Sequence, residues 1–253
     1  MQPTVSIIIA VKNAKNLLAQ TLSSIRAQRY PHIEVIVIDG GSTDGTVEVI
    51  HENNDIVNKS ISEQDNGISD AFNKGLALSS GTFINFQGAG DTLYSPNAIA
   101  QLFEDVDEDV ELVCGQVTRV QEDGVTPIWI APKMAKPFHV RSLLFKMSLP
   151  HQGLFTHRRF FEKFGYFDEK VRFAMDYDLL LRAFHQFPKT VVKQVMVSNW
   201  RAGGIGSNRI GEIFDEYHRL KTKYHIASNV VLKAIDKFTR AKYKIKTLLR
   251  VAY

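Results

Sequence analysis

The chain has 253 residues, 44% of them hydrophobic and 23% charged, which fits one large globular domain or one domain with an extension. Its only cysteine, Cys114, excludes an intrachain disulfide and a cysteine-based metal cluster, as is usual in a reducing compartment. The net charge is +4, but residues 230–253 alone carry +6, so residues 1–229 sum to −2. Because only the tail is basic, we expect no nucleic-acid partner.

The first apolar stretch is predicted to be a strand and not a targeting or membrane segment. It lies in the N-terminal sequence MQPTVSIIIAVKN, which has no basic region before it and is too short to span a bilayer. No later stretch approaches the length of a membrane span. We therefore expect a cytoplasmic protein that is soluble or peripheral on the inner face of the cytoplasmic membrane.

The first hundred residues alternate between predicted strands and helices. Nearly continuous apolar runs predict buried strands, and apolar residues recurring along one face predict helices. The strands are expected at residues 4–11, 33–38, 56–61 and 82–86, and the helices at residues 13–28, 46–51 and 68–78. Ser42 or Thr43 is a possible cap of the second helix, and Ser95-Pro96 is expected to start a fourth. This alternation predicts an α/β fold with a parallel sheet.

The second half has a different pattern. Two strands at residues 111–119 and 125–131 are predicted to form a hairpin around Glu122-Asp123-Gly124. Further on we predict helices at residues 141–146, 157–165, 176–187 and 210–224, and a strand at residues 190–199.

Three aspartates follow predicted strands. Asp39 ends the strand in the stretch EVIVIDGGSTDGT, residues 34–46, while Asp65 and Asp91 follow the next two strands beside glycines. Because the carboxyl ends of parallel strands lie side by side, these carboxylates are expected to ring one crevice. The alternative is that Asp and Gly are ordinary loop residues there.

These motifs carry a family resemblance. The segments VSIIIAVKN, EVIVIDGGSTDGT, SEQDNGISDAFNKG and FQGAGD resemble the N-terminal half of family-2 glycosyltransferases with the GT-A fold. The later segments HQGLF, GYFDE and MDYDLLLR are similar to the acceptor half of the branch that builds bacterial exopolysaccharide, such as colanic-acid transferases. The resemblance covers roughly residues 4–210. It implies a mixed, mostly parallel sheet flanked by helices, with a donor half at about residues 1–110 and an acceptor half at about residues 111–225.

The resemblance further implies an inverting transfer from a UDP- or GDP-linked sugar. Asp39 would accept a hydrogen bond from the nucleotide base, and the backbone near residues 10–12 would form a wall of the same pocket. The other donor-binding residues that it implies are Ala10, Val11, Asn13, Asp65, Asp70, Asn73, Lys74 and Gly90. Many relatives have an arginine at the position of Phe72, so Lys74 or Arg201 is left to meet the phosphates. Lys74 is equally well read as an ordinary surface lysine. The glycine-rich residues 203–207 could close over the diphosphate.

Asp91 matches the last aspartate of the family's D-x-D-like metal motif. Mg²⁺ or Mn²⁺ bridging the diphosphate would offset the charge of the leaving group. Gly88 and Gly90 stand where further carboxylates often occur, so the metal is expected to be weakly held. The alternative is that Asp91 only shapes a turn.

Asp176 matches the family's catalytic base, which removes the proton of the attacking acceptor hydroxyl. The alternative is that it only caps a helix. Asp178 is expected to make a structural pair with Arg182, four residues further along the same helix. His151 and Gln152 line the acceptor side in relatives, although a lone histidine is often structural.

The tail, residues 226–253, is predicted to be a basic amphipathic helix. Such a helix suits an anionic membrane surface, where a lipid-linked glycan acceptor would lie. It could instead pack on the body or on a partner subunit. Overall we expect a glycosyltransferase of cell-surface polysaccharide synthesis. One alternative is a nucleotide-sugar-binding or scaffold protein with weak catalysis. Another is a nucleotidyltransferase, which would need a basic, glycine-rich loop after the first strand, but that loop has no glycine here.

Overall fold

The computed structural model describes residues 2–133, 138–204 and 209–248. Its first half follows the predicted alternation of strands and helices closely. In chain order the elements are β1 (Val5–Val11), α1 (Lys15–Arg26), β2 (Ile33–Asp39), α2 (Thr46–Glu52), β3 (Val57–Ser62), α3 (Ile68–Leu78), β4 (Phe83–Gly88), β5 (Thr92–Leu93) and α4 (Ala98–Phe103).

The second half contains shorter helices and longer strands. Its elements are β6 (Leu112–Val120), β7 (Pro127–Ala131), the 3₁₀ turns η1 (Val140–Leu144) and η2 (His151–Gly153), β8 (Leu154–His157), α5 (Arg158–Phe164), α6 (Met175–Arg182), a third 3₁₀ turn η3 (Phe184–Gln186), β9 (Thr190–Arg201), α7 (Ile210–Lys223) and α8 (Asn229–Leu248). The predicted hairpin is confirmed, because β6 and β7 pair antiparallel.

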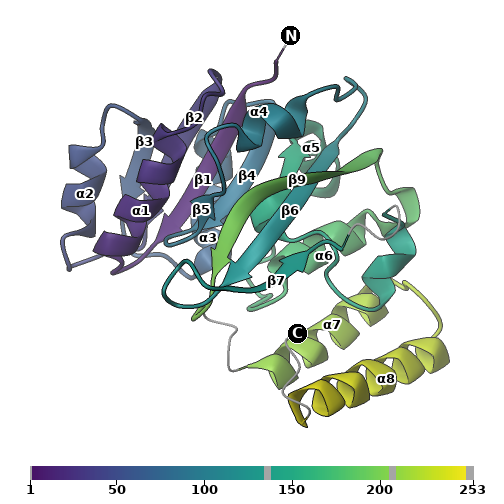
Figure 1. The fold of residues 1–253 in the computed structure, drawn as a ribbon. Helices are drawn as coiled ribbons and strands as arrows, with labels where there is room; N and C mark the ends of the chain where they lie inside the picture. Colours follow the sequence, from purple (N-terminus) through teal and green to yellow (C-terminus); the bar gives the residue numbers. More distant parts are fainter. Residues whose placement is uncertain (1, 134–137, 205–208, 249–253) are drawn as a thin grey trace.

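All the described strands belong to one mixed sheet with the order β3-β2-β1-β4-β8-β6-β9-β5, and β7 pairs with β6 (Figure 1). The strands β3, β2, β1 and β4 run parallel, as predicted for the first half. The short strand β8 then joins the two halves, because it pairs antiparallel with both β4 and β6. The predicted α/β architecture with a mixed sheet flanked by helices is therefore confirmed.

Apolar clusters cover both faces of the sheet. On one face, α1, α2 and α4 contribute buried residues such as Leu22, Val49 and Leu102. On the other face, α3, α5 and α6 contribute residues such as Phe72, Phe160 and Leu180. The two clusters explain why β1 and β2 are apolar along nearly their whole length, since each of these strands faces a core on both sides.

Several predicted boundaries were wrong, each for a local reason. The N-cap of α2 is Gly45, because the Ser42 hydroxyl donates instead to Asp39. The helix α4 begins after Asn97, not at Ser95-Pro96. The Ser95 carbonyl accepts from Gln28 Nε2 and the Pro96 carbonyl accepts from the Arg29 N–H, and both donors lie just after α1.

Two further differences concern the second half. The helix predicted at residues 176–187 ends at Arg182, where an Ala183 N–H bond to the Leu180 carbonyl tightens the last turn before η3. The strands β5 and β8 were not predicted, because their two and four residues are too short to show an alternating pattern.

The C-terminal helix α8 lies beside α7, outside the sheet and its covering helices (Figure 1). Leu232 is fully buried, Tyr243 meets the Phe214 ring edge-on at 5.7 Å between centroids, and Arg240 forms a 2.7 Å ion pair with Asp215. Across the residues that the structure describes, no helix is both long and apolar enough to cross a membrane.

Candidate active site

The carboxyl ends of the parallel strands form one edge of the sheet. In the strand register Val11 lies opposite Asp39, Asp39 opposite Ser62, and Ala10 opposite Gly88. The loops that carry Asp65 and Asp91 leave from this same edge, directly after β3 and β4. The three aspartates therefore follow strand ends at one edge of the sheet, and that their carboxylates ring one crevice stays a prediction.

Asp39 is a fully buried carboxylate held by serines. Its Oδ2 accepts from the Ser62 hydroxyl at 2.7 Å and from the Ser42 N–H at 3.0 Å, and its Oδ1 accepts from the Ser42 hydroxyl. A carboxylate has about four lone-pair positions, so these three bonds leave one acceptor position. Asp39 is thus fixed in orientation, with little capacity for a further partner.

The loop after β1 is bonded to the loop after β2. Asn13 has a left-handed backbone, with φ of 48°. Its N–H donates to the Ser42 hydroxyl at 2.7 Å, and its side-chain oxygen accepts from the Thr43 N–H at 2.9 Å. Ala10 and Val11 form the strand end beside this pair. The predicted donor residues of the first two strands therefore form one connected unit.

Asp65, in the loop after β3, lies beside Gly40 in the loop after β2. A Cβ atom at Gly40 would lie 2.4 Å from Asp65 Oδ2, so a larger residue there would require the Asp65 side chain to move. The other oxygen of Asp65 accepts from the Gly67 N–H at 3.0 Å.

The three polar residues predicted on α3 divide into two groups. Lys74 forms ion pairs with Glu63 at 2.8 Å and with Asp70 at 3.1 Å. Asn73 instead bonds the backbone of Phe167 through both its amide nitrogen, at 3.0 Å, and its oxygen, at 2.9 Å. Asp70 and Lys74 thus share a face as predicted, whereas Asn73 links α3 to the second half of the chain.

Asp91 is buried, with only 6% of its surface exposed. Its Oδ1 accepts from the Arg201 N–H at 3.0 Å, and its Oδ2 accepts from the Gly88 N–H and from Gln152 Nε2, both at 3.2 Å. Burial raises its pKa above the ordinary value, although these donors and the charge of His151 act in the opposite direction. Gly90 beside it has φ of +96°, which favours glycine.

The turn η2, which carries His151 and Gln152, is fixed to β4 by buried amides. Asn85 Nδ2 lies 3.0 to 3.3 Å from the carbonyl oxygens of His151, Gln152 and Leu154. Gln87 Nε2 donates to the Gln152 carbonyl at 2.9 Å. Neither Asn85 nor Gln87 was predicted, although two polar residues within a buried strand are an unusual pattern that could have drawn attention to them.

His151 and Asp176 meet at the start of α6. Their Nδ1 and Oδ2 atoms are 3.2 Å apart, and both side chains are partly exposed. Burial lowers the pKa of His151, but the hydrogen bond and charge of Asp176, with the charge of Asp91, outweigh burial and raise it. The second oxygen of Asp176 accepts from the Tyr177 N–H at 2.7 Å.

Glu216 of α7 holds the chain immediately before α6. Its carboxylate accepts from the backbone N–H groups of Arg172, Phe173 and Ala174 at 2.8 to 3.0 Å. These three N–H groups lie directly before α6, so no carbonyl within the helix can accept from them. Glu216 was not predicted, because it lies 40 residues from Asp176 and no local pattern connects them.

Asp178 has the structural role that the sequence predicted. It is fully buried, and its Oδ2 accepts from Arg182 Nε at 3.0 Å. Its Oδ1 accepts from the Tyr224 hydroxyl at 2.8 Å. Asp178 therefore joins α6 to the end of α7 and faces away from the His151–Asp176 pair.

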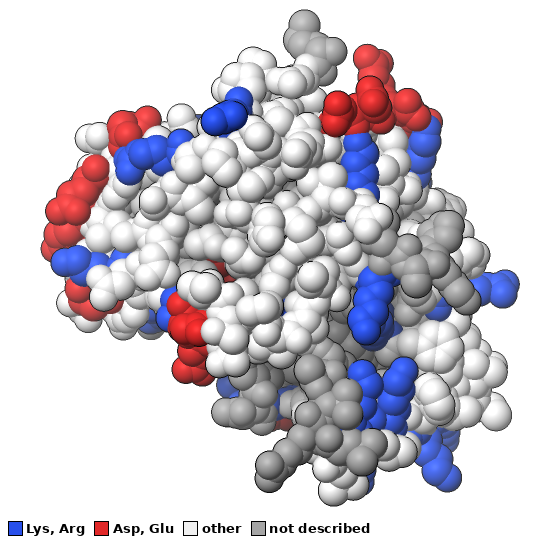
Figure 2. Space-filling view, viewed as in Figure 1, with Lys and Arg blue, Asp and Glu red and all other residues white. Residues whose placement is uncertain are grey.

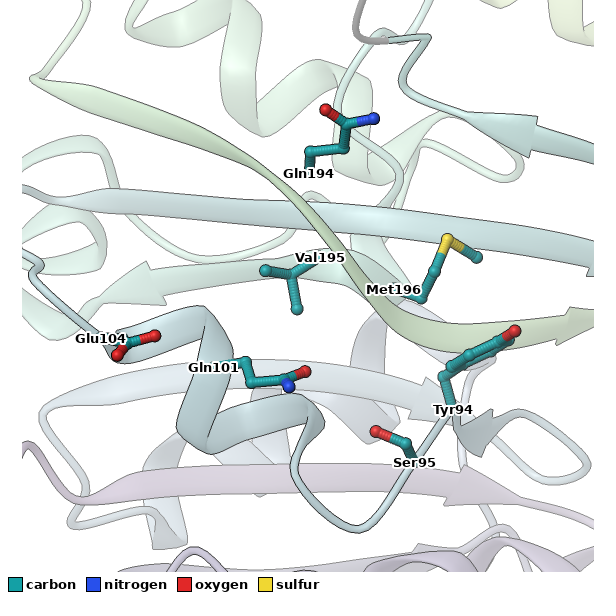
Figure 3. Close-up of a pocket in the computed structure, with 7 residues that line it drawn as sticks. All are labelled: Tyr94, Ser95, Gln101, Glu104, Gln194, Val195 and Met196. Atoms are coloured by element: carbon teal, nitrogen blue, oxygen red, sulfur yellow. The ribbon is translucent and has the colours of Figure 1, made fainter.

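Two surface hollows lie elsewhere in the described part of the chain. One of about 450 Å³ lies between α4 and β9 and is lined by residues such as Gln101, Glu104 and Val195 (Figure 3). Another of about 480 Å³ is lined by residues such as Thr118, Ile130 and Asn199. Neither is lined by a predicted site residue, so we assign the site from the polar contacts and not from the size of a cavity.

Residues 6–165 match the family described as Glycosyl transferase family 2. The PGL/p-HBAD biosynthesis glycosyltransferase of Mycobacterium bovis (strain BCG / Pasteur 1173P2) is 29% identical over 242 residues, covering 91% of this chain and 90% of that protein.

Solved structures share the fold at low sequence identity. S. aureus TarS 1–349 in complex with UDP-GlcNAc has a TM-score of 0.71 and 16% identity, covering 93% of this chain and 70% of that one. The mannosyltransferase PcManGT from Pyrobaculum calidifontis, in complex with GDP-Man and Mn²⁺, has a TM-score of 0.66 and 18% identity, covering 94% and 69%. The chain spans 39% of a longer TarS structure. The sheet is that of GT-A glycosyltransferases, and the chain is a glycosyl-transferring enzyme that belongs to glycosyltransferase family 2.

Proposed function

We propose that this enzyme transfers a sugar from a UDP- or GDP-linked donor to an acceptor hydroxyl, with inversion at the anomeric carbon. One observation carries the proposal. The successive residues His151 and Gln152 contact two separate carboxylates, Asp176 at 3.2 Å and Asp91 at 3.2 Å. One short turn thereby contacts both the proposed base and the proposed diphosphate-side carboxylate.

Asp176 would act as the general base. As the acceptor oxygen attacks the anomeric carbon, its proton passes to Asp176, and the bond between that carbon and the diphosphate oxygen breaks. Each oxygen of Asp176 already has one protein partner, and each retains a lone pair for the incoming hydroxyl. His151 would orient the carboxylate from the acceptor side, and Gln152 would fix η2 through Asp91.

Asp39 would recognise the nucleotide base with its remaining acceptor position. That position could accept from the imide N–H of uracil or from the N–H groups of guanine, so it does not select between them. Ala10, Val11, Asn13 and Asp65 surround it, and Asp70, Asn73, Lys74 and Gly90 would complete the donor side.

Asp91 would hold Mg²⁺ or Mn²⁺ together with the donor diphosphate. The fit is limited, because three hydrogen bonds leave its carboxylate one acceptor position, and burial raises its pKa. Among the residues that the structure describes, no group of three or more His, Cys, Asp or Glu side chains could hold a metal ion alone. A bound cation would offset the negative charge of the leaving diphosphate.

The acceptor is proposed to be a lipid-linked glycan of cell-surface polysaccharide synthesis, reached at the cytoplasmic face of a membrane. One face of α8 packs on α7, but its residues Val231, Phe238 and Ile245, seven apart, are 45%, 58% and 56% exposed. Burial lowers the pKa of Lys146, and the charges of Lys242 and Lys246 on the same helix, with that of Lys133, lower it further.

Lys and Arg side chains gather over the part of the surface where α7 and α8 lie (Figure 2). Exposed apolar residues between lysines suit an anionic bilayer. The paired substitutions Phe238→Ser and Ile245→Ser should reduce binding to vesicles containing phosphatidylglycerol, with Thr247→Ser as a control. The double variant keeps the buried Leu232, which a deletion of the tail would remove. If the double variant binds vesicles as well as the wild type, this surface is excluded as the membrane contact.

The transfer itself is tested by screening UDP-, GDP- and dTDP-linked sugars for thermal stabilisation and for slow donor hydrolysis, with and without Mn²⁺. We expect a UDP- or GDP-linked sugar to stabilise the protein and to be hydrolysed. Binding without hydrolysis or transfer would favour the alternative, a catalytically weak nucleotide-sugar-binding protein. A lack of response to every donor would contradict the donor assignment.

A further inference from the structure

A stacked arginine borders the site on the side of β6. Arg119 lies opposite Trp129 of β7 and opposite Trp200 of β9 in the strand register. Its guanidinium carbon is 4.0 Å from the centroid of the Trp200 ring, and the two indoles meet edge-on at 5.6 Å between centroids. The guanidinium therefore lies over the face of one ring, and this contact limits its rotation.

This guanidinium has no hydrogen bond or ion pair with any residue that the structure describes. The two cations predicted to meet the phosphates differ from it. Lys74 is paired with two carboxylates, and Arg201 donates through its guanidinium to Gln20 at 3.2 Å. Unlike those two side chains, Arg119 is a cation near the site whose N–H donors are all available to a ligand.

Arg119 and Asp91 are connected by charge and through the backbone. Burial lowers the pKa of Arg119, and the charge of Asp91 raises it in opposition, so the two side chains share an electrostatic environment. The backbone gives a second connection, because the N–H that follows Trp200, that of Arg201, donates to Asp91 Oδ1 at 3.0 Å. The donors bonded directly to Asp91 are neutral amides, so no direct ion pair joins these two residues.

The chemistry of this arrangement favours a phosphate ligand. A guanidinium presents its N–H donors in its own plane, so stacking on an indole leaves them available for two parallel bonds to phosphate oxygens. A half-buried cation without a bonded anion is also costly until an anion joins it. With Asp91 as its one protein carboxylate, a metal ion at this position would be weakly held. A bound diphosphate would therefore need positive charge from another group.

We propose that Arg119, held against Trp200, binds the diphosphate of the nucleotide-sugar donor. This inference rests on the proposed function, because it assigns a ligand to the same site. The positive charge of Arg119 would stabilise the leaving nucleoside diphosphate whether or not a metal ion is bound at Asp91.

The test is calorimetric binding of UDP, GDP, uridine and guanosine to the full chain in EDTA. We expect Arg119→Ala to weaken binding of the nucleoside diphosphate by about 10- to 100-fold, as for loss of a charge-assisted hydrogen bond, and to leave the nucleoside unaffected. Arg119→Lys should show an intermediate loss, because it keeps the charge without the planar fork. Its retained charge and length also make it the safer variant for folding.

Arg172→Ala is the matched control, because its guanidinium lies 5.2 Å over the ring of Phe173 and outside the proposed donor residues. If the wild-type chain binds no nucleoside diphosphate, the proposed function fails. If the wild type binds and both Arg119 variants bind equally well, only the present inference fails. An equal loss for nucleoside and nucleoside diphosphate would also overturn it, because that outcome indicates a purely structural arginine.

Discussion

Asp176 Oδ2 lies 3.2 Å from His151 Nδ1, although the two residues are 25 positions apart in the chain. Asp176 comes from the first turn of α6, and His151 comes from η2, which the buried amides of β4 hold in place. Two unrelated local structures therefore converge on one partly exposed carboxylate. This convergence distinguishes Asp176 from Asp178, which is fully buried and engaged by Arg182.

The first prediction concerns the carboxylate itself. Asp176→Asn keeps the size of the side chain but removes its ability to accept a proton, so transfer should fall by about 10²- to 10⁴-fold. Donor affinity, measured by calorimetry, should remain within about twofold, since Asp176 is placed on the acceptor side. Asp55→Asn, an exposed change at a surface ion pair, serves as the control. Full transfer activity in the Asp176 variant would exclude it as the base.

The second prediction concerns pH. Because the pKa of His151 is raised in the folded protein, the folded state holds this proton more tightly than the unfolded state. The resulting stability is fully present below about pH 6.5, the ordinary value for histidine, and is lost as the pH rises through the raised pKa. The difference in melting temperature between the wild type and His151→Asn should therefore shrink from pH 5.5 to pH 8.5.

The pKa of Asp91 is also raised, so Asp91 adds its own pH dependence to the melting temperature. Because Asp91 is present in both the wild type and His151→Asn, its contribution largely cancels when the two melting temperatures are subtracted. In Asp176→Asn, the charge of Asp176 no longer offsets burial at His151, so adding His151→Asn to that variant should no longer give a difference in melting temperature that shrinks as the pH rises. A constant difference in melting temperature across the pH range would contradict the pairing.

Residue patterns predicted much of this fold, for reasons that are local. The strands β1, β2 and β4 were recognisable because continuous apolar runs mark strands that are buried on both faces. The Asp178–Arg182 pair was predictable because residues four apart on a helix are neighbours. The placement of Asp39 and Asp91 at one edge followed from the parallel order of the strands.

The contacts that build the acceptor side could not be predicted in this way. The strand β8 pairs with β4 and β6 over only a few residues, and η2 directly before it brings His151 to Asp176 and Gln152 to Asp91. Arg119 gave no signal, because a single arginine in a strand is usually a surface residue. The roles of the predicted site residues remain predictions, which the proposed variants test.

The third prediction concerns Glu216, which we expect to position the start of α6. Glu216→Ala removes the acceptor of three backbone N–H groups, so Asp176 should shift and kcat should fall by about 10- to 100-fold. The KM for the donor should change little. Glu216→Gln retains an acceptor oxygen and should recover part of the activity, whereas a purely structural role would lower stability and both kinetic constants together. Glu212→Gln, exposed on the same helix, is the control.

The fourth prediction compares two ion pairs with the same spacing. Asp178 is fully buried against Arg182, whereas the side chains of Asp236 and Arg240 are 23% and 32% exposed. Breaking a buried pair leaves an uncompensated charge, so Asp178→Asn should lower the free energy of unfolding by about 3–5 kcal/mol. Asp236→Asn should lower it by less than about 1 kcal/mol, because water screens the remaining arginine. Urea denaturation of both variants measures the contrast, and similar losses would show that Asp178 does not join α6 to α7 as a buried charge.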